Sequence, residues 1–342
     1  MTDRLPLQCD FSLHEHNTFG IRAKANAYIQ VTSADILSEI RLDNSLSTLP
    51  RLVLGGGSNI LLSGDFPGLV LHMCLKGIEI VGRDAQSTYV RAAAGESWHG
   101  LVCRTLELGL GGLENLSLIP GSVGAAPIQN IGAYGVELKD CFHALSAFDF
   151  DTGNIFTLNR DECDFGYRDS VFKHRLAGQA AILDVTFALP RQWQPNLNYA
   201  ELEQELAVRG KPDPTARDIS DAVVAIRTRK LPDPAVIGNA GSFFKNPVVP
   251  AAQRERLLAK HPKLVSYGQP DGSFKLAAGW LIDQCGWKGR RVGNAGVYEK
   301  QALVLVNHGG ASGRELQDLA KAIQADVLAR FGVELEPEPV IV

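Results

Sequence analysis

The sequence of 342 residues contains no long apolar run. No segment reaches the roughly 18 uninterrupted apolar residues that a membrane-spanning helix needs. Residues 1–10 carry charges and no apolar stretch, so we also expect no signal peptide. The sequence therefore predicts a cytoplasmic protein with no membrane partner.

An excess of basic residues is also missing. The 34 Lys and Arg are outnumbered by 38 Asp and Glu, which gives a formal net charge of −4. Proteins that bind nucleic acid broadly usually carry a basic excess over the whole domain, so we expect no nucleic-acid partner. A small anionic substrate stays compatible with this balance, because a few well-placed cations are enough to bind it.

No pair of cysteines has the spacing of a metal site or a redox motif. We therefore predict no metal site, and we expect buried free thiols in a reducing compartment. The six cysteines are Cys9, Cys74, Cys103, Cys141, Cys163 and Cys285.

Three common motifs are absent as well. The sequence has no GxGxxG dinucleotide fingerprint, no Walker loop and no GxSxG nucleophile elbow, so any dinucleotide must be held in another way. It has no internal repeat or low-complexity tract, and nothing in it implies an obligatory protein partner. The length and a hydrophobic content of 45% predict two or three domains with cores of their own.

Apolar runs and alternation predict strands mainly in the first half, and helical periodicity predicts helices mainly in the second. A capping box at Ser312 and a stop at Gly332 mark the best-defined helix. Prolines in the segment 231–234 suggest a domain junction. This mixture predicts an α+β fold. The predicted strands are Arg51–Leu54, Leu69–Leu71, Thr88–Ala92, Ala144–Asp149, Ile155–Leu158 and an alternating segment at 183–189; the other predicted helices lie at 97–108 and 219–226.

Two glycine-rich segments are candidates for ligand binding. Leu54–Leu61 reads LGGGSNIL, and Ile119–Gly135 reads IPGSVGAAPIQNIGAYG. Glycines after a strand let the backbone approach a ligand closely, and their N–H groups can face phosphate oxygens. Each segment taken alone is equally compatible with a tight turn.

Gly238–Pro247, which reads GNAGSFFKNP, contains a serine between a glycine and two aromatic residues. The hydroxyl of Ser242 could therefore lie in a partly apolar pocket. The alternative is a turn serine that bonds its own backbone.

Two charged segments complete the set of candidates. Arg168, in Tyr167–Ser170, is either a partner in a structural ion pair or a bidentate ligand for a carboxylate or phosphate. The tail Leu335–Val342 reads LEPEPVIV and predicts an edge strand, unless its apolar residues draw one carboxylate inward.

The order of these segments along the chain closely resembles the UDP-N-acetylenolpyruvoylglucosamine reductase family. The similarity runs from about Asn17 to Glu338. Tyr199 matches a substrate-loop tyrosine found in one of the two structural classes of the family, which assigns the chain to the longer class. The matching motifs are NTFG at 17–20, LGGGSNIL, IPGSVGAAPIQNIGAYG, YRDS, RTRKLPDP at 227–234, GNAGSFFKNP and LEPE.

The resemblance implies an α+β fold of three domains. Two strand-rich domains form an FAD-binding unit of the vanillyl-alcohol-oxidase (PCMH) type, and a third α/β domain binds the substrate. The expected bounds are 1–76 joined by a C-terminal strand at 333–342, then 77–231, and then 232–332 for the third domain.

The resemblance also implies a reaction. NADPH reduces a non-covalent FAD and leaves, and the enolpyruvyl ether of a UDP-sugar then accepts a hydride from flavin N5 at its C3. Arg168, with Glu338 as its companion, matches the residue that stabilises the charge developing at the substrate carboxylate. Ser242 matches the donor of the proton to C2.

Binding roles follow from the same resemblance. Tyr199, Lys230 and Asn246 match residues that hold the diphosphate and uridine end of the substrate, whose pocket NADPH is expected to use in turn. The expected FAD-binding residues are Gly55, Gly56, Gly57, Ser58, Asn59, Gly121, Ser122 and Gly124.

One departure and two rival functions accompany the resemblance. Family tails continue with a valine and a basic residue after the glutamate, whereas here Pro339 and Val340 follow Glu338. A proline removes one donor from a strand, so the placement of Glu338 becomes a question for the structure. The rivals are another FAD enzyme on the same scaffold, such as an oxidase of small alcohols, and a nucleotide-binding regulatory module without catalysis.

Overall fold

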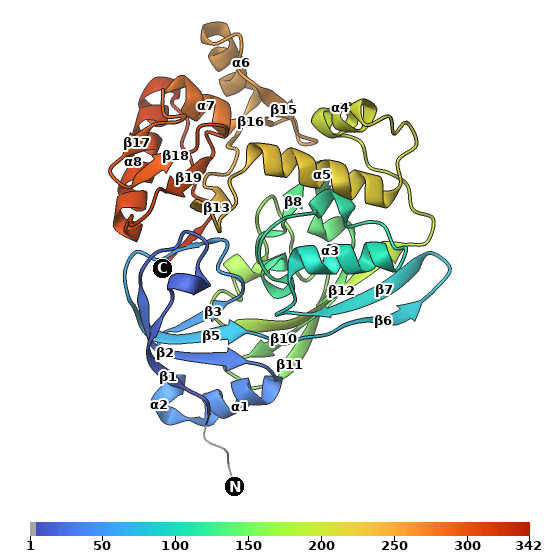
Figure 1. Cartoon of the computed structure of the whole chain (residues 1–342), viewed down its shortest axis with the longest axis vertical. Helices are drawn as coiled ribbons and strands as arrows, with labels where there is room; N and C mark the ends of the chain where they lie inside the picture. Colours follow the sequence, from blue (N-terminus) through green and yellow to red (C-terminus); the bar gives the residue numbers. More distant parts are fainter. Residues whose placement is uncertain (1–4) are drawn as a thin grey trace. The chain divides into compact units, whose positions relative to one another are not determined.

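The computed structural model describes residues 5–342 (Figure 1). The chain folds into two compact units. Unit 1 comprises the described residues through Phe11, Ala25–Gly57 and Pro67–Arg229, and unit 2 comprises Ser12–Lys24, Ser58–Phe66 and Lys230–Val342. The chain passes for the last time from unit 1 to unit 2 between Arg229 and Lys230, next to the proline-rich segment 231–234. The expected division into three domains stays a prediction. Among the described residues, no helix is both long and apolar enough to cross a membrane.

The first sheet of unit 1 has four strands in the order β1-β2-β5-β3. Side chains of β2 and β5 pack on helix α1, where Ile29, Leu37 and Leu71 are fully buried. The short strand β3 pairs in parallel with β5 and ends at Leu54, so it delivers the first glycine-rich loop at its carboxyl end. The elements are β1 (Gln8–Ser12), β2 (Lys24–Val31), α1 (Ala34–Leu42), α2 (Asn44–Ser47), β3 (Arg51–Leu54) and β5 (Phe66–Met73).

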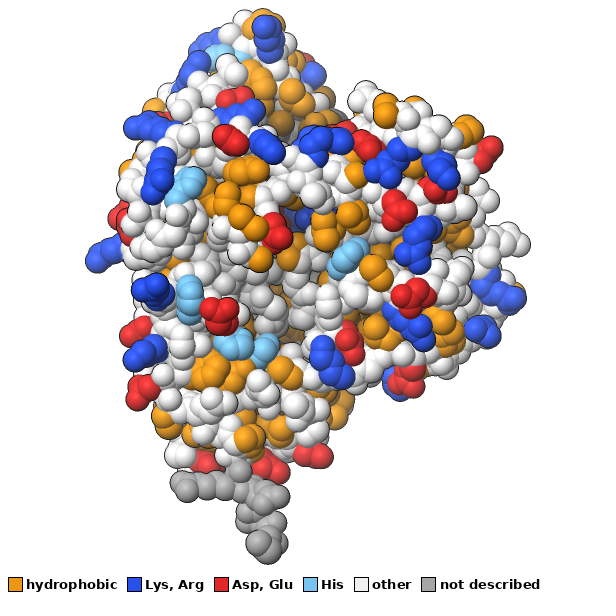
Figure 2. Space-filling model, in the orientation of Figure 1, with side chains coloured by type: hydrophobic (Ala, Val, Ile, Leu, Met, Phe, Trp, Pro, Cys, Tyr) orange, Lys and Arg blue, Asp and Glu red, His pale blue; other side chains and the backbone are white. Residues whose placement is uncertain are grey.

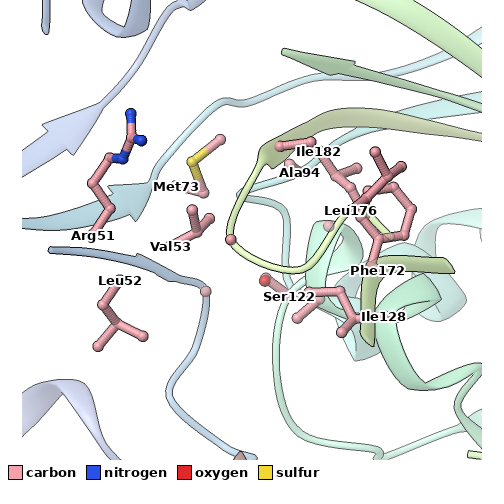
Figure 3. Close-up of a pocket in the computed structure, with 15 residues that line it drawn as sticks. Arg51, Leu52, Val53, Met73, Ala94, Ser122, Ile128, Phe172, Leu176 and Ile182 are labelled. Carbon is pink, nitrogen blue, oxygen red and sulfur yellow. The ribbon is translucent and has the colours of Figure 1, made fainter. Parts of the chain in front are cut away.

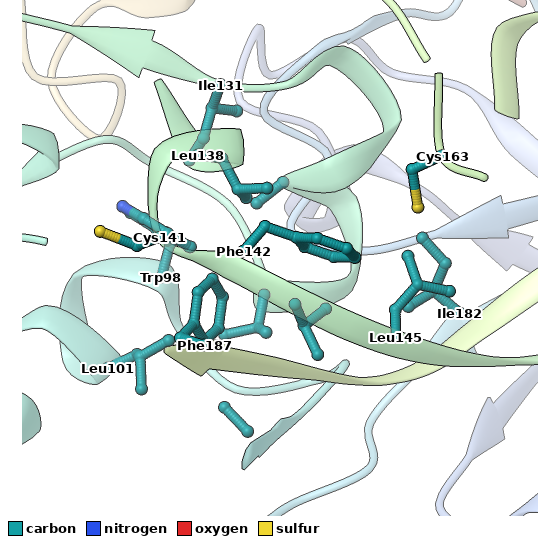
Figure 4. Close-up of a cluster of buried hydrophobic side chains, with 14 of the residues drawn as sticks. Trp98, Leu101, Ile131, Leu138, Cys141, Phe142, Leu145, Cys163, Ile182 and Phe187 are labelled. Atoms are coloured by element: carbon teal, nitrogen blue, oxygen red, sulfur yellow. The ribbon is translucent and has the colours of Figure 1, made fainter. Parts of the chain in front are cut away.

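The second sheet of unit 1 is antiparallel, with the order β11-β10-β12-β7-β6. Its central strand β12 buries Leu183, Val185, Phe187 and Leu189 and leaves the residues between them partly exposed, which confirms the predicted half-buried strand. Figure 4 shows Phe187 in the buried cluster that this sheet forms with helix α3. The strands are β6 (Ile78–Arg83), β7 (Ser87–Ala93), β10 (Phe142–Asp149), β11 (Ile155–Asn159) and β12 (Ala180–Pro190).

Three helices and a small hairpin complete unit 1. Ser97 caps α3 (Trp98–Glu107) by accepting a hydrogen bond from the backbone N–H of Gly100, as predicted. Helix α4 (Ala200–Val208) packs on α5 (Ala216–Lys230) through the apolar faces of both helices. The hairpin consists of β8 (Gly132–Ala133) and β9 (Val136–Glu137).

Unit 2 contains three further sheets, in the orders β13-β19-β18-β17, β14-β16-β15 and β20-β4. The predicted capping box of Ser312 and Glu315 begins α8, and Gly332 ends it at φ 63°. The final strand β20 pairs in parallel with β4. The elements are β4 (Ile60–Leu61), β13 (Gly238–Ser242), β14 (Val248–Val249), α6 (Ala251–Lys260), β15 (Ser266–Gly268), β16 (Phe274–Leu276), α7 (Ala278–Gln284), β17 (Arg291–Val292), β18 (Ala295–Val297), β19 (Val304–Asn307), α8 (Gly313–Phe331) and β20 (Val340–Ile341).

The cysteines are all free, but their burial differs from the expectation. Cys141 and Cys163 are buried, whereas Cys9 is exposed and the remaining three are partly buried. The expectation of a buried thiol is wrong for Cys9 because its strand β1 is the edge strand of its sheet and has no buried residue.

On the face shown in Figure 2, basic and acidic side chains are interspersed.

Candidate active site

The two glycine-rich segments of unit 1 are in direct contact. A Cβ atom on Gly55 would lie 2.2 Å from the Oγ of Ser122, and one on Gly56 would lie 3.0 Å from the Cα of Gly121. Gly57 and Gly121 have φ angles of 62° and 117°, where glycine is favoured. Glycine is therefore required here by close backbone approach as well as by turn geometry.

The second glycine segment is fixed to the chain between β7 and α3. The N–H of Gly124 donates to the carbonyl oxygen of Ala94 at 2.9 Å, and the N–H of Trp98 donates to that of Gly121 at 3.0 Å. A Cβ atom on Gly124 would lie 2.5 Å from the Cβ of Ala94. Any side chain at position 124 would thus push this segment away from its support.

A cavity of about 260 Å³ adjoins the contact between the glycine segments. Figure 3 shows Val53 and Met73 on one side of it and Ser122 and Ile128 on the other. The Ser122 hydroxyl is buried and, within residues 5–342, has no hydrogen-bond partner. A buried hydroxyl that donates to no acceptor costs free energy. A ligand that placed an acceptor within reach of this hydroxyl would therefore be bound more tightly.

These features fit the FAD that the sequence predicts. Backbone at Gly55, Gly56 and Gly121 can approach a diphosphate closely, the packing of Gly124 on Ala94 supports this segment from behind, and the Ser122 hydroxyl can donate to the diphosphate.

Arg168 lies at the tip of a tight loop in unit 1. Gly166 and Asp169 pair across this loop, and Arg168 has a φ angle of 55°, which is unusual for a residue with a side chain. The Nη2 of Arg168 donates to the carbonyl oxygen of Gly132 at 2.6 Å. The neighbouring carboxylate of Asp169 bonds His174 at 2.7 Å.

Tyr199 precedes α4 and packs on Tyr134, with ring centroids 5.1 Å apart. Tyr134 is hydrogen-bonded to Arg227, and burial raises the pKa of Tyr134 to about 12. Burial also lowers the pKa of Arg227, whose Nε donates to the carbonyl oxygen of Leu118. The sequence reasoning did not single out Tyr134 or Arg227, although both lie inside its motifs.

Ser242 is the last residue of β13 in unit 2. It follows Gly241, which has a φ angle of 69°, and it precedes the buried Phe243 and Phe244. The pairing of β13 with β19 is irregular between Asn239 and Ser242. The serine is therefore half-buried at a kinked strand end, beside apolar side chains.

The tail of the chain pairs with the segment that follows Ser242. The N–H of Glu338 donates to the carbonyl oxygen of Phe243 at 2.8 Å, and Phe244 and Pro337 form an isolated bridge. Glu338 is half-buried, whereas Glu336 is exposed and forms an ion pair with Lys245 at 2.5 Å. Of these two glutamates in the tail, only Glu338 is thus partly buried.

Pro339 does not interrupt this pairing. Val340 donates to the carbonyl oxygen of Asn59 at 3.0 Å, and Val342 donates to that of Leu61 at 2.9 Å. The tail is held by the backbone N–H groups of Glu338, Val340 and Val342. The N–H group that Pro339 lacks is therefore not needed for this pairing. The side chain of Asn59 reaches the carbonyl oxygen of Glu338 at 3.4 Å.

The other predicted substrate residues lie in unit 2 as well. Lys230 ends α5, and the Oδ1 of Asn246 accepts a hydrogen bond from the N–H of Ala278 at the start of α7. Asn246 therefore helps to hold a helix N-terminus. The structure brings Ser242 and Glu338 together in unit 2, and it places Arg168 and Tyr199 in unit 1.

Comparison with known proteins identifies the family. A family model described as the C-terminal domain of UDP-N-acetylenolpyruvoylglucosamine reductase matches residues 233–342, and an FAD binding domain matches residues 25–159. The UDP-N-acetylenolpyruvoylglucosamine reductase of Ralstonia nicotianae is 60% identical over 336 residues, which are 97% of this chain and 98% of that protein. The chain belongs to the UDP-N-acetylenolpyruvoylglucosamine reductase family.

Further relatives agree with this assignment. The reductase of the same name from Paraburkholderia phymatum is 56% identical over 341 residues, covering 99% of this chain and 98% of the relative. The crystal structure of the reductase from Thermus caldophilus superposes with a TM-score of 0.68 at 23% identity, covering 99% and 98% of the two chains. The expected fold class, an α+β protein with an FAD-binding unit and a C-terminal domain of the reductase family, is confirmed.

Proposed function

We propose that this chain reduces UDP-N-acetyl-3-O-(1-carboxyvinyl)-glucosamine to UDP-N-acetylmuramate with NADPH, using non-covalent FAD, for peptidoglycan precursor synthesis. The observation that carries this function is the 60% identity to a reductase of UDP-N-acetylenolpyruvoylglucosamine over almost the whole of both chains. The match of residues 25–159 to an FAD binding domain supports the cofactor. Bound FAD supplies a carrier that takes a hydride from NADPH and passes it to the substrate.

Arg168 is the residue we assign to the substrate carboxylate. Addition of a hydride at C3 moves negative charge through C2 into that carboxylate, and a fixed guanidinium stabilises it as it develops. Removing one such donor from an active site commonly costs roughly 3–4 kcal/mol. The bond from Arg168 to the carbonyl of Gly132 supports this role, because it holds the guanidinium in place before the substrate arrives.

Ser242 is the residue we assign to proton delivery at C2, with Glu338 as the companion carboxylate of the site. A serine is a weak acid in water, but an enolate-like carbon next to it is a strong base, so the transfer is feasible in a closed site. The backbone bond from Glu338 to Phe243 supports the assignment, because it ties the glutamate to the residue after the serine.

The remaining residues are assigned to binding. Lys230, Tyr199 and Asn246 hold the diphosphate and uridine end of the substrate, with Lys230 as a point cation for phosphate. NADPH takes the same pocket before the substrate. The glycine segments would hold the FAD diphosphate, with the hydroxyl of Ser122 as the side-chain donor, because this buried hydroxyl has no hydrogen-bond partner within residues 5–342. Ser58 and Asn59 remain assigned as further donors from the first segment.

An absorbance spectrum of the purified protein tests this function. We expect flavin bands that bleach on anaerobic addition of NADPH and return when the enolpyruvyl UDP-sugar is added. Return only with oxygen would indicate an oxidase, and a colourless protein or a yellow one without turnover would indicate a regulatory module. Cell fractionation would test the cytoplasmic location that we propose with it.

A further inference from the structure

Asn130 is a fully buried residue in the middle of the second glycine-rich segment, at 0% exposure. Its φ angle is 43°, in the left-handed region that asparagine tolerates better than most residues. Its carboxamide makes three hydrogen bonds. Nδ2 donates to the carbonyl oxygen of Gly166 at 2.9 Å and to the Oε2 of Glu137 at 3.0 Å, and Oδ1 accepts from the N–H of Lys139 at 3.0 Å.

These bonds connect the loop that carries Arg168 to the hairpin that accepts the hydrogen bond of its side chain. Gly166 is the first residue of the tight loop that carries the arginine, and it pairs with Asp169 across the loop. Glu137 belongs to β9, which pairs directly with Gly132 of β8, the acceptor for the guanidinium. The carboxamide of Asn130 therefore sets the distance between the backbone of Arg168 and the acceptor of its side chain.

The backbone of Asn130 contributes to the same arrangement. Its carbonyl oxygen accepts a longer bond of 3.5 Å from the Nη1 of Arg168, two residues before the stronger acceptor Gly132. A side chain at position 132 would crowd this geometry, because its Cβ would lie 2.9 Å from the same Nη1. The loop is also held from its other end, where Ser170 donates to the carbonyl oxygen of Ile128 at 2.7 Å.

We propose that Asn130 is a positioning residue of the reduction, which fixes the guanidinium of Arg168 where the substrate carboxylate binds. This inference rests on the proposed function of Arg168. A buried carboxamide that makes three hydrogen bonds to two separate segments holds a side chain more rigidly than the loop alone, and active-site groups must be held to within about 0.5 Å. A displacement of about 1 Å can cost about 10²-fold in rate.

The test uses the flavin-loaded enzyme and measures its two half-reactions separately by stopped-flow absorbance. Asn130→Gly keeps the left-handed backbone accessible and removes the carboxamide together with its methylene group. We expect it to slow reoxidation of the flavin by the enolpyruvyl UDP-sugar by about 10- to 100-fold. Reduction of the flavin by NADPH should stay within about threefold of wild type, because Arg168 acts on the substrate carboxylate.

A double-mutant cycle separates positioning from general support of the fold. If Asn130 acts through Arg168, then Asn130→Gly adds less than about threefold to the loss already caused by Arg168→Ala. A full additional loss in that background, or equal slowing of both half-reactions, would overturn the proposal. So would normal reoxidation by the single variant.

Two further variants keep the proposal testable if Asn130→Gly folds poorly. Asn130→Asp keeps the shape but turns an oxygen toward the carboxylate of Glu137 and the carbonyl of Gly166, so the same selective loss is expected. Asn307→Ala is the matched control, because Asn307 is also buried and bonds three backbone groups, in unit 2. It should lower the melting temperature but should not slow reoxidation more than it slows reduction. In combination with Arg168→Ala, its effect on the reoxidation rate should be the same as in the wild type.

The outcomes also distinguish this proposal from the proposed function. If the wild-type enzyme is not reoxidised by the UDP-sugar, then the function itself is wrong. If the wild type is reoxidised but Asn130→Asp behaves like Asn307→Ala, then only the role of Asn130 is wrong.

Discussion

The backbone N–H of Glu338 donates a hydrogen bond of 2.8 Å to the carbonyl oxygen of Phe243, the residue that follows Ser242. Residues almost a hundred positions apart are thereby held at neighbouring places in unit 2. The bond uses main-chain atoms, so it holds the tail whatever side chain stands at position 338. Substitutions of Glu338 should therefore change chemistry more than structure.

Glu338→Gln should lower kcat by about 10²-fold while the protein keeps its flavin and its melting temperature. The carboxylate is lost, but the backbone bond to Phe243 remains. Glu336→Gln is the matched control, since Glu336 is two residues away and its side chain is 69% exposed beside Lys245. Steady-state NADPH oxidation with the UDP-sugar measures both variants. Similar losses in the two would remove Glu338 from the reaction.

Ser242→Ala should leave flavin reduction by NADPH nearly normal and slow reoxidation by the substrate by about 10²-fold or more. The reason is that only the second half-reaction needs a proton at C2. Ser242→Cys keeps a proton donor and should recover part of the rate. Stopped-flow absorbance measures both steps, and equal slowing of the two by Ser242→Ala would exclude the acid role.

Gly124→Ala should weaken FAD binding and destabilise the protein by about 1–3 kcal/mol, as overpacking of a tight contact does. The added methyl would meet the Cβ of Ala94 at 2.5 Å. Ala94→Gly removes that methyl, so the double variant should recover flavin content. Gly64→Ala is the control, because nothing lies within 4 Å of a Cβ at position 64. Flavin fluorescence during dilution measures the affinity; tight binding by Gly124→Ala would contradict the assigned cradle.

The exposed thiol of Cys9 and the buried thiols of Cys141 and Cys163 should react at different rates. Burial raises the pKa of Cys141 and that of Cys163 to about 12, so neither forms thiolate at pH 8 in the folded protein. Cys9 is exposed and should react with Ellman's reagent at once. Cys9→Ser should abolish this fast phase, and denaturant should release the two buried thiols. Rapid labelling of Cys141 or Cys163 in the native protein, located by mass spectrometry, would contradict their burial.

Stability should fall as the pH rises from about 9 to about 12. Folding raises the pKa of Cys141 and of Cys163 from 9.0 to about 12, and it raises that of Tyr134 from 10.0 to about 12. The unfolded chain therefore loses these protons first, and stability that is fully present below pH 9 is lost as the pH approaches the folded values. Urea denaturation at a series of pH values measures the slope. The double variant Cys141→Ala, Cys163→Ala should have a shallower slope than the wild type.

Local patterns were sufficient to predict several of the regular elements. The strand at Arg51–Leu54 has the predicted bounds, and the capped helix at Ser312 begins and ends as its signals indicate. Alternation in β12 correctly separated its buried from its partly exposed residues. These features depend on neighbours in the chain, so the sequence carries them directly.

Contacts between distant segments could not be predicted from local patterns. The sequence left two carboxylates possible in the tail. The backbones of both Glu336 and Glu338 pair with the segment after Ser242, and Glu338 is half-buried while Glu336 is exposed. Nor did the sequence indicate that the guanidinium of Arg168 donates to the carbonyl oxygen of Gly132. Nothing in the local pattern of Asn130 indicated that it joins the loop of Arg168 to its acceptor.

By itself, then, the sequence determined the family and many of the regular elements, because motifs and periodicity are properties of short segments, and it provides the site residues that we propose. Tertiary structure alone decided which glycines touch, which tail carboxylate is half-buried and what holds Arg168 in place. The physical reason is that hydrogen bonds and close packing between distant segments depend on how the whole chain folds, and spacing along the sequence does not record them.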